Sequence, residues 1–255
     1  EADISNVWTS TAARSELLYD ARQGNLKQLL ARKLDVRYGD VQILYDVDFE
    51  VEQGEIIALL GTNGAGKSTL LKAITGVVEA HSGAIIFEGR DITHVPPHEI
   101  ATMGIAMVPG GQGVFPSLTV AENLRIASWI DRKNKAEVQR RIDEVLTMFP
   151  VLGERLEDAA ANLSGGQQQM LALGMAFLAR PKLLAIDELS LGLAPVIVAQ
   201  LLPVVQRIAE QGTTVILVEQ SVNVALTVAE SAVFMEKGEI RFKGPTAELL
   251  ERPDV

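Results

Sequence analysis

The sequence predicts an α/β fold with a largely parallel sheet that helices cover on both faces. Short apolar runs with strand character alternate with helical segments along most of the 255-residue chain, an order typical of this architecture. A glycine-rich turn at residues 61–68 stands between one such strand and the helical segment after it. That setting is the one in which a phosphate-binding loop occurs.

Each part of the chain supports this fold in turn. Residues 31–38 and 43–55 alternate apolar and polar side chains, the period of half-buried strands, and residues 55–61 form a short apolar strand. Between about 114 and 161 the apolar spacing is helical and charges are frequent. Strand-like runs then return at residues 182–187, 213–219, 231–236 and 239–244. Lys237-Gly238 predicts a hairpin between the last two runs.

Composition narrows the possible functions. The formal net charge of −10 argues against broad binding to nucleic acid or to anionic lipid. The chain has no cysteine, so a disulfide framework and a thiolate metal site are excluded. The longest apolar run, residues 170–179, is too short to span a bilayer and is interpreted as a buried core helix.

The glycine-rich turn matches the pattern GxxxxGK[ST] in full. Glycines let backbone N–H groups surround an anion, and the N-terminus of the following helix adds its dipole. Lys67 brings a positive charge to the β- and γ-phosphates of a nucleotide, and Ser68 offers a hydroxyl to Mg²⁺. The residues expected to bind nucleotide here are Gly61, Thr62, Asn63, Gly64, Ala65, Gly66, Lys67, Ser68 and Thr69.

Two carboxylates end the apolar run at residues 182–187. Burying a carboxylate is unfavourable, so Asp187 and Glu188 at the end of a buried strand suggest a function. Next to a nucleotide, Asp187 can hold Mg²⁺ and Glu188 can orient and deprotonate the attacking water. Two solvated acids at the start of a loop are the alternative.

A second possible anion-binding helix start lies about a hundred residues after the first. Residues 163–167 read LSGGQ before a helical segment, and Ser164 is a good N-cap. Gly165 and Gly166 leave backbone N–H groups open to an anion, with Gln167 beside them. A capped helix with a flexible entry is the alternative interpretation of these five residues.

The order and spacing of these three motifs resemble those of ABC-transporter ATPases over about residues 31–255. The resemblance implies a P-loop NTPase ABC ATPase core with a mostly parallel sheet, an N-terminal antiparallel β part and an inserted helical subdomain at about 114–161. It implies ATP and Mg²⁺ as ligands. It also implies a site between two domains packed head to tail, in which the LSGGQ of one domain faces the γ-phosphate held by the other. Tyr38 matches the aromatic that stacks on adenine, with a strand tyrosine packed at the core edge as the alternative.

Further segments resemble one of the two ATPase subunits of branched-chain amino acid importers. These are residues 189–195 and 216–226, and residues 89–124 agree with them. Related systems for urea and short amides share nearly the same pattern. An ATP-hydrolysing subunit that energises such an importer is therefore expected. An ATPase of a lipid or lipopolysaccharide exporter, or a non-transport ABC ATPase, is the alternative.

Three positions depart from the family at large. Gln220 stands where most members have a histidine that contacts the γ-phosphate, and its amide can donate a hydrogen bond but carries no charge. Gly110 stands where the family has a Gln or Glu that reaches Mg²⁺ and water. Gln112 is a possible substitute metal ligand, loosely placed among glycines. Ala194 stands where many members have Asp, in a loop that crosses to the partner domain.

The resemblance also implies partners and a location. A second ABC ATPase domain, from the same or a sister chain, and integral-membrane permease subunits are expected, with residues 114–161 as the permease contact. Association with the membrane would be indirect, at the cytoplasmic face of the inner membrane, and nucleic acid is not an expected partner.

Residues 1–30 differ from the rest and are interpreted as a helical linker or extension, with a disordered tail as the alternative. Their apolar clusters at residues 17–19 and 26–30 suit a helix–turn–helix that lies on another surface. The expectation is a larger polypeptide in which a permease precedes the ATPase. A start methionine lost to processing is the alternative.

Overall fold

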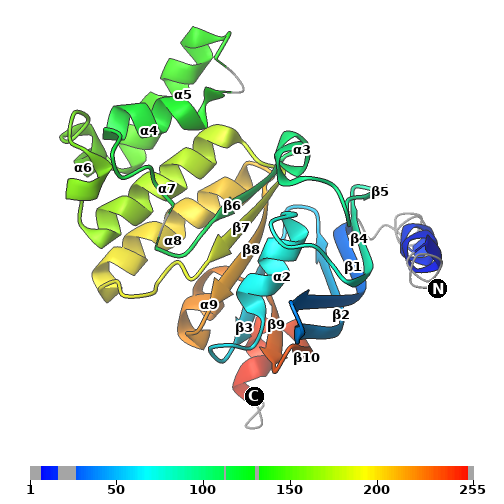
Figure 1. Cartoon of the computed structure of the whole chain (residues 1–255). Helices are drawn as coiled ribbons and strands as arrows, with labels where there is room; N and C mark the ends of the chain where they lie inside the picture. Colours follow the sequence, from blue (N-terminus) through cyan, green and yellow to red (C-terminus); the bar gives the residue numbers. More distant parts are fainter. Residues whose placement is uncertain (1–6, 17–26, 112, 130–131, 252–255) are drawn as a thin grey trace.

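A computed structural model describes residues 7–16, 27–111, 113–129 and 132–251, and its main body is a six-stranded sheet in the order β10-β9-β3-β8-β7-β6. Five strands run parallel, and β10 pairs antiparallel with β9 through the predicted hairpin (Figure 1). The strands are β3 (Ile56–Gly61), β6 (Ile105–Val108), β7 (Leu183–Asp187), β8 (Thr214–Glu219), β9 (Ser231–Glu236) and β10 (Glu239–Pro245). The predicted α/β class with a mostly parallel sheet is confirmed.

A second, four-stranded antiparallel sheet has the order β2-β1-β4-β5. Its strands are β1 (Lys27–Tyr38), β2 (Val41–Glu52), β4 (Ser82–Phe87) and β5 (Arg90–Asp91). This sheet is the antiparallel part expected from the resemblance. β1 lies in its interior, paired with β2 on one side and with β4 on the other.

Helices follow most strands of the main sheet or lead into them. They are α2 (Lys67–Ile74), α3 (Pro97–Thr102), α8 (Pro195–Glu210), α9 (Val222–Val228) and the 3-10 turn η3 (Thr246–Glu251). A helical group follows β6. It comprises α4 (Val120–Ala127), α5 (Lys135–Met148), α6 (Pro150–Gly153), η2 (Ala160–Asn162) and α7 (Gly165–Ala179). Figure 1 shows α4, α5 and α6 beyond α7, on the side of the molecule away from the antiparallel sheet.

The two faces of the parallel sheet pack into different cores. Within β7, Leu183 and Ala185 join a core shared with α2 and the antiparallel sheet, whereas Leu184 and Ile186 join a core shared with α7 and α8. Successive side chains of a strand point to opposite faces, so a strand covered on both faces needs a continuous apolar run. Asp187 ends that run at the carboxyl edge, where open α/β sheets bind ligands.

α7 confirms the expectation of a buried core helix for residues 170–179, most of which are buried. No helix within the described part of the chain is long and apolar enough to cross a bilayer.

The expected boundary between extension and core is wrong by four residues. Residues 27–30 are not helical but begin β1. Leu29 joins the main core, while Leu30 packs on the opposite face with Ala13, which lies in a helix over residues 7–16. Because both faces of β1 are covered here, its start lacks the polar–apolar alternation of a half-buried strand. The cluster at residues 17–19, and residue 26 of the second cluster, lie outside the described residues.

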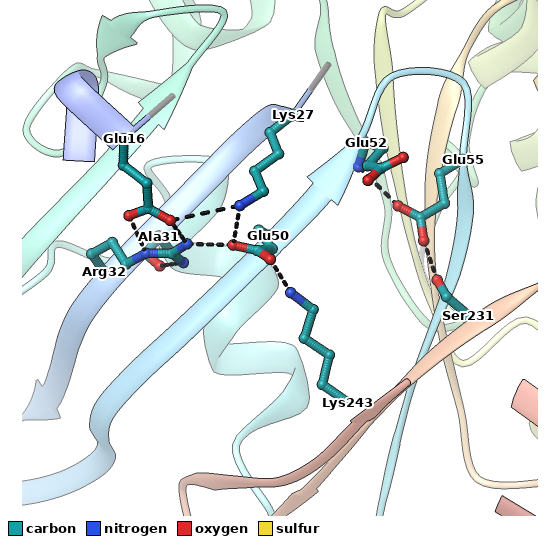
Figure 2. A network of polar contacts seen from close by, with 9 residues as sticks. All are labelled: Glu16, Lys27, Ala31, Arg32, Glu50, Glu52, Glu55, Ser231 and Lys243. Atoms are coloured by element: carbon teal, nitrogen blue, oxygen red, sulfur yellow. Dashed lines mark hydrogen bonds and ion pairs between the residues drawn. The ribbon is translucent and has the colours of Figure 1, made fainter. Parts of the chain in front are cut away.

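A network of charged side chains joins the helix at residues 7–16 to both sheets (Figure 2). Arg32 on β1 donates to Glu16 at 2.9 Å and also pairs with Glu50 on β2. Glu50 pairs further with Lys27, at 3.1 Å, and with Lys243 on β10. Although burial opposes the effect, the contacts with Lys243 and Arg32 lower the pKa of Glu50 to about 2. The helix is therefore a packed part of the fold.

Candidate nucleotide-binding and catalytic site

The phosphate loop joins β3 to α2, as the sequence predicts. Gly61 has φ 148°, and a Cβ there would lie 2.2 Å from the carbonyl oxygen of Met235 on β9. Gly66 has φ 101° and caps α2 in the left-handed region, which L side chains rarely adopt. These two glycines are required for the turn that carries backbone N–H groups to the start of α2.

Lys67 is the first residue of α2 and is buried. Its Nζ donates to the carbonyl oxygens of Gly61, at 2.8 Å, and Thr62, at 2.9 Å. An ammonium has three N–H donors. Two of them hold the Lys67 charge over the loop, and the third is available to bind an anion. Burial lowers the pKa of Lys67, while Glu188 and Asp187 oppose that shift. The acid pair thus lies within electrostatic reach of the loop.

Ser68 and Asp187 meet across the site, although they are far apart in sequence. The Ser68 hydroxyl donates to Asp187 Oδ1 at 3.0 Å. Burial raises the pKa of Asp187, and the Ser68 hydrogen bond opposes that rise. A hydroxyl and a carboxylate are hard oxygen donors of the kind that Mg²⁺ prefers. No group of three or more acidic or histidine side chains forms a metal site in the described residues. The pair therefore fits Mg²⁺ that takes its remaining ligands from phosphate and water.

Glu188 follows β7 in a strained conformation. Its φ of 53° lies in the left-handed region, which costs roughly 1–3 kcal/mol for a non-glycine residue. The side chain of Gln220, just after β8, donates from Nε2 to Glu188 Oε1 at 2.8 Å. Backbone strain held in place by a neighbouring contact is typical of functional positions.

The glycine-rich segment after β6 is packed more closely than its composition suggests. A Cβ on Gly110 would lie 3.2 Å from the carbonyl oxygen of Asp187, and one on Gly113 would lie 2.6 Å from the Cβ of Ala172 on α7. Gly110 thus packs closely against Asp187 and Glu188, and the lack of a side chain at Gly113 allows the segment to approach α7. Gln112, the possible metal ligand, lies outside the described residues.

The helix expected after LSGGQ is α7, and it begins with a capping box. Ser164 accepts from the backbone N–H of Gln167, and the Gln167 side chain accepts from the backbone N–H of Ser164 at 2.9 Å. Gly165 is exposed, and a Cβ there would meet nothing closer than 3.9 Å. Gly166 is buried, and a Cβ there would lie 2.8 Å from the side chain of Ile197. The backbone at Gly165 is therefore open to a ligand, while the Gln167 side chain serves the cap.

A family model described as ABC transporter matches residues 44–190. The chain belongs to the ABC transporter family. It is an ATPase, built on the ATP-binding cassette of that family.

Several known proteins are similar to this ABC ATPase over most of their length. The high-affinity branched-chain amino acid transport ATP-binding protein BraG of Pseudomonas aeruginosa is 46% identical over 88% of this chain and 95% of its own. The probable branched-chain amino acid transport ATP-binding protein LivF of Archaeoglobus fulgidus is 39% identical over 86% and 92%. The ADP conformation of MJ1267, an ATP-binding cassette of an ABC transporter, has a TM-score of 0.79 at 26% identity, covering 90% of this chain and 97% of that one.

Tyr38, which the family resemblance matches to the adenine-stacking aromatic, ends β1 with 45% of its surface exposed. A ring with this exposure can be reached by a base, and the stacking role of Tyr38 stays a prediction. The histidines of this ABC ATPase, His81, His94 and His98, are exposed, and His98 lies in α3.

Sequence reasoning missed one residue at the site. Glu219 is the last residue of β8 and only 1% exposed. Its carboxylate accepts from the backbone N–H of Ser190, at 3.0 Å, and from the Ser190 hydroxyl, at 2.6 Å. The signal was present, because an acid at the end of an apolar run is the same pattern that identified Asp187.

Proposed function

We propose that this ATPase energises an importer of branched-chain amino acids, or of related small polar solutes such as urea or amides. The similarity to BraG and LivF supports the transported class, and residues 189–195 and 216–226 carry the same sequence pattern. The observation that carries the ATPase chemistry is the meeting of Lys67 and Ser68 on α2 with the Asp187-Glu188 pair at the end of β7.

The proposed chemistry divides between binding and hydrolysis. The phosphate loop and Lys67 bind the β- and γ-phosphates of ATP, and Ser68 with Asp187 holds Mg²⁺. The ion, when bound, neutralises charge on the phosphates. Glu188 orients the attacking water and accepts its proton. Gln220 holds the Glu188 carboxylate in place through the contact at 2.8 Å.

The proposed assembly contains a second ABC ATPase domain and membrane permease subunits, at the cytoplasmic face of the inner membrane. One phosphate loop and one LSGGQ are present in this chain, so the head-to-tail site needs a second domain. Residues 113–129 carry three exposed large apolar side chains, Phe115, Ile126 and Trp129. Exposed apolar side chains are available to a protein partner, and we propose that these three contact the permease.

Closure of the dimer can be tested at Gly165. Trp in place of Gly165 should fit the isolated chain, because nothing crowds a Cβ there, but should block an approaching phosphate. ATP binding by the monomer should stay unchanged, while hydrolysis falls by roughly 10²-fold, the usual effect of losing donors aimed at developing charge. Gly165→Ala is the mild control, and calorimetry with a turnover assay measures both. Full turnover in Gly165→Trp would contradict the head-to-tail site.

The transported class can be tested by uptake in cells that depend on this ATPase. The cells should accumulate labelled leucine, isoleucine and valine. Accumulation of labelled urea or acetamide instead would assign the importer to the related solutes that the proposal includes. Trp129→Ser should reduce uptake without changing ATP hydrolysis by the ATPase dimer in the absence of the permease, because Trp129 is exposed and follows α4, which Figure 1 shows beyond α7 and away from α2. Uptake of none of these solutes, with hydrolysis intact, would overturn the proposed importer.

A further inference from the structure

The last two residues of β8, Val218 and Glu219, and the next residue, Gln220, hold the segment that follows β7. The carbonyl oxygen of Val218 accepts from the backbone N–H of Glu188 at 3.0 Å. The carboxylate of Glu219 accepts from the backbone and hydroxyl of Ser190 at 3.0 and 2.6 Å. The amide of Gln220 donates to the Glu188 side chain at 2.8 Å. Val218 thus holds the backbone of Glu188, Gln220 holds the Glu188 side chain, and Glu219 holds Ser190, two residues further along the chain.

Glu219 has no part in the binding chemistry described above. It is 1% exposed, and burial raises its pKa while the Ser190 hydrogen bonds oppose that rise. A buried carboxylate is unfavourable unless its oxygens are hydrogen-bonded. Here both carboxylate oxygens accept hydrogen bonds from Ser190: Oε1 accepts from the backbone N–H and Oε2 from the hydroxyl. The burial of this acid is therefore linked directly to the position of the segment after Glu188.

That segment needs to be held. Glu188 lies in the left-handed region with φ 53°, and Gly192 four residues later has φ 70°. Between them Leu189 is buried, while Leu191 is 60% exposed. A non-glycine residue keeps a left-handed conformation only when its surroundings enforce it. The contact between Glu219 and Ser190 anchors the chain two residues beyond Glu188, whereas Val218 and Gln220 bond to Glu188 itself.

We propose that Glu219 is a positioning residue for ATP hydrolysis, which fixes Ser190 and thereby the geometry of Glu188. The inference rests on the proposed role of Glu188 as general base. Glu219 itself touches neither ATP nor water in this scheme. Its removal should therefore affect turnover and leave nucleotide binding, which the phosphate loop provides, unchanged.

The expected result separates kcat from affinity. Glu219→Leu keeps the volume but removes both acceptors, so kcat should fall by roughly tenfold or more, since misplacement of about 1 Å can cost 10²-fold. The Kd for ATP should stay the same. Glu219→Gln should retain most of the parental kcat, because its amide can accept from the Ser190 N–H and donate to the Ser190 hydroxyl. Stopped-assay turnover and calorimetric ATP binding give the two quantities.

Two further variants keep the test decisive. Ser190→Ala removes one of the two hydrogen bonds with little risk to folding, and a smaller fall in kcat is expected. Thr214→Val is the matched control, because Thr214 is fully buried at the other end of β8 and accepts from the Gly54 N–H at 2.8 Å. It should lower Tm and leave kcat per folded molecule unchanged. Parental kcat in both Glu219→Leu and Ser190→Ala would overturn the inference, as would equal losses in Glu219→Leu and Glu219→Gln.

Failure of this inference can be told apart from failure of the proposed mechanism. If Glu188→Gln abolishes turnover while Glu219→Leu and Ser190→Ala are silent, only the positioning role is wrong. If Glu188→Gln hydrolyses ATP at the parental rate, the assignment of the base is wrong, and a positioning role through Glu188 falls with it.

Discussion

Replacing Glu188 with Gln is expected to leave ATP binding intact and to slow hydrolysis by about 10²–10⁴-fold, the usual contribution of a general base. The reason is specific to this site. The Gln220 amide donates to Glu188 Oε1, and a glutamine at 188 keeps an oxygen that can accept the same bond. Its shape and tether are preserved, so the substitution removes the basic oxygen and little else.

Single-turnover hydrolysis and calorimetric binding would measure the two effects of Glu188→Gln separately. Glu236→Gln is the matched control, because Glu236 ends β9 of the same sheet and its side chain is 46% exposed. That control should turn over at the parental rate. Hydrolysis at the parental rate in Glu188→Gln would place the base elsewhere, whereas a loss of ATP binding would show that Glu188 supports the nucleotide pocket.

The main sheet was predictable because its strands carry strong local signals. β7 and β8 are continuous apolar runs with polar residues at their ends, and a phosphate loop fixes the position of β3 before α2. The start of β1 was not predictable in the same way. Leu29 and Leu30 point into different cores, and the second of these includes the helix at residues 7–16, whose packing no local pattern reveals.

The residues of the candidate site also differ in how far local sequence signals could predict them. Lys67, Ser68, Asp187 and Glu188 belong to motifs in which neighbours in the sequence define the chemistry. Glu219 belongs to none, since its role depends on the parallel register of β7 and β8, which pairs Asp187 with Val218. That register places the next residues of both strands side by side. A sequence pattern can show that an acid ends a buried strand, but only the pairing shows what the acid holds.

The packing of Gly110 is a further case that requires three dimensions. From the sequence, the glycines here suggested only that the neighbouring Gln112 is loosely placed. In the structure a Cβ there would lie 3.2 Å from the Asp187 carbonyl oxygen and 3.7 Å from the Glu188 Cβ. The absent side chain therefore lets the loop lie directly on the acid pair, a relation that local composition does not contain.

Replacing Lys67 with Ala is expected to weaken ATP binding by about 10- to 100-fold. Hydrogen bonds to charged groups contribute about 1.5–3 kcal/mol, and each 1.4 kcal/mol is a factor of ten in affinity. The change removes the positive charge that the loop carbonyls of Gly61 and Thr62 hold over the phosphate position. It also removes the two contacts that tie the loop to α2, so the backbone N–H groups are less well organised for an anion.

Lys135→Ala is the matched control for Lys67→Ala, because Lys135 carries the same charge at the first position of another helix, α5, and is exposed. Both variants lower the net charge of the chain by one, so a general electrostatic effect would weaken ATP binding equally in the two. A local role for Lys67 predicts a large loss in Lys67→Ala and a small one in Lys135→Ala, since screening weakens charges that do not contact the ligand. Calorimetry measures the affinity of both variants for ATP. Unchanged affinity in Lys67→Ala, or equal losses in the two variants, would show that Lys67 does not bind the nucleotide.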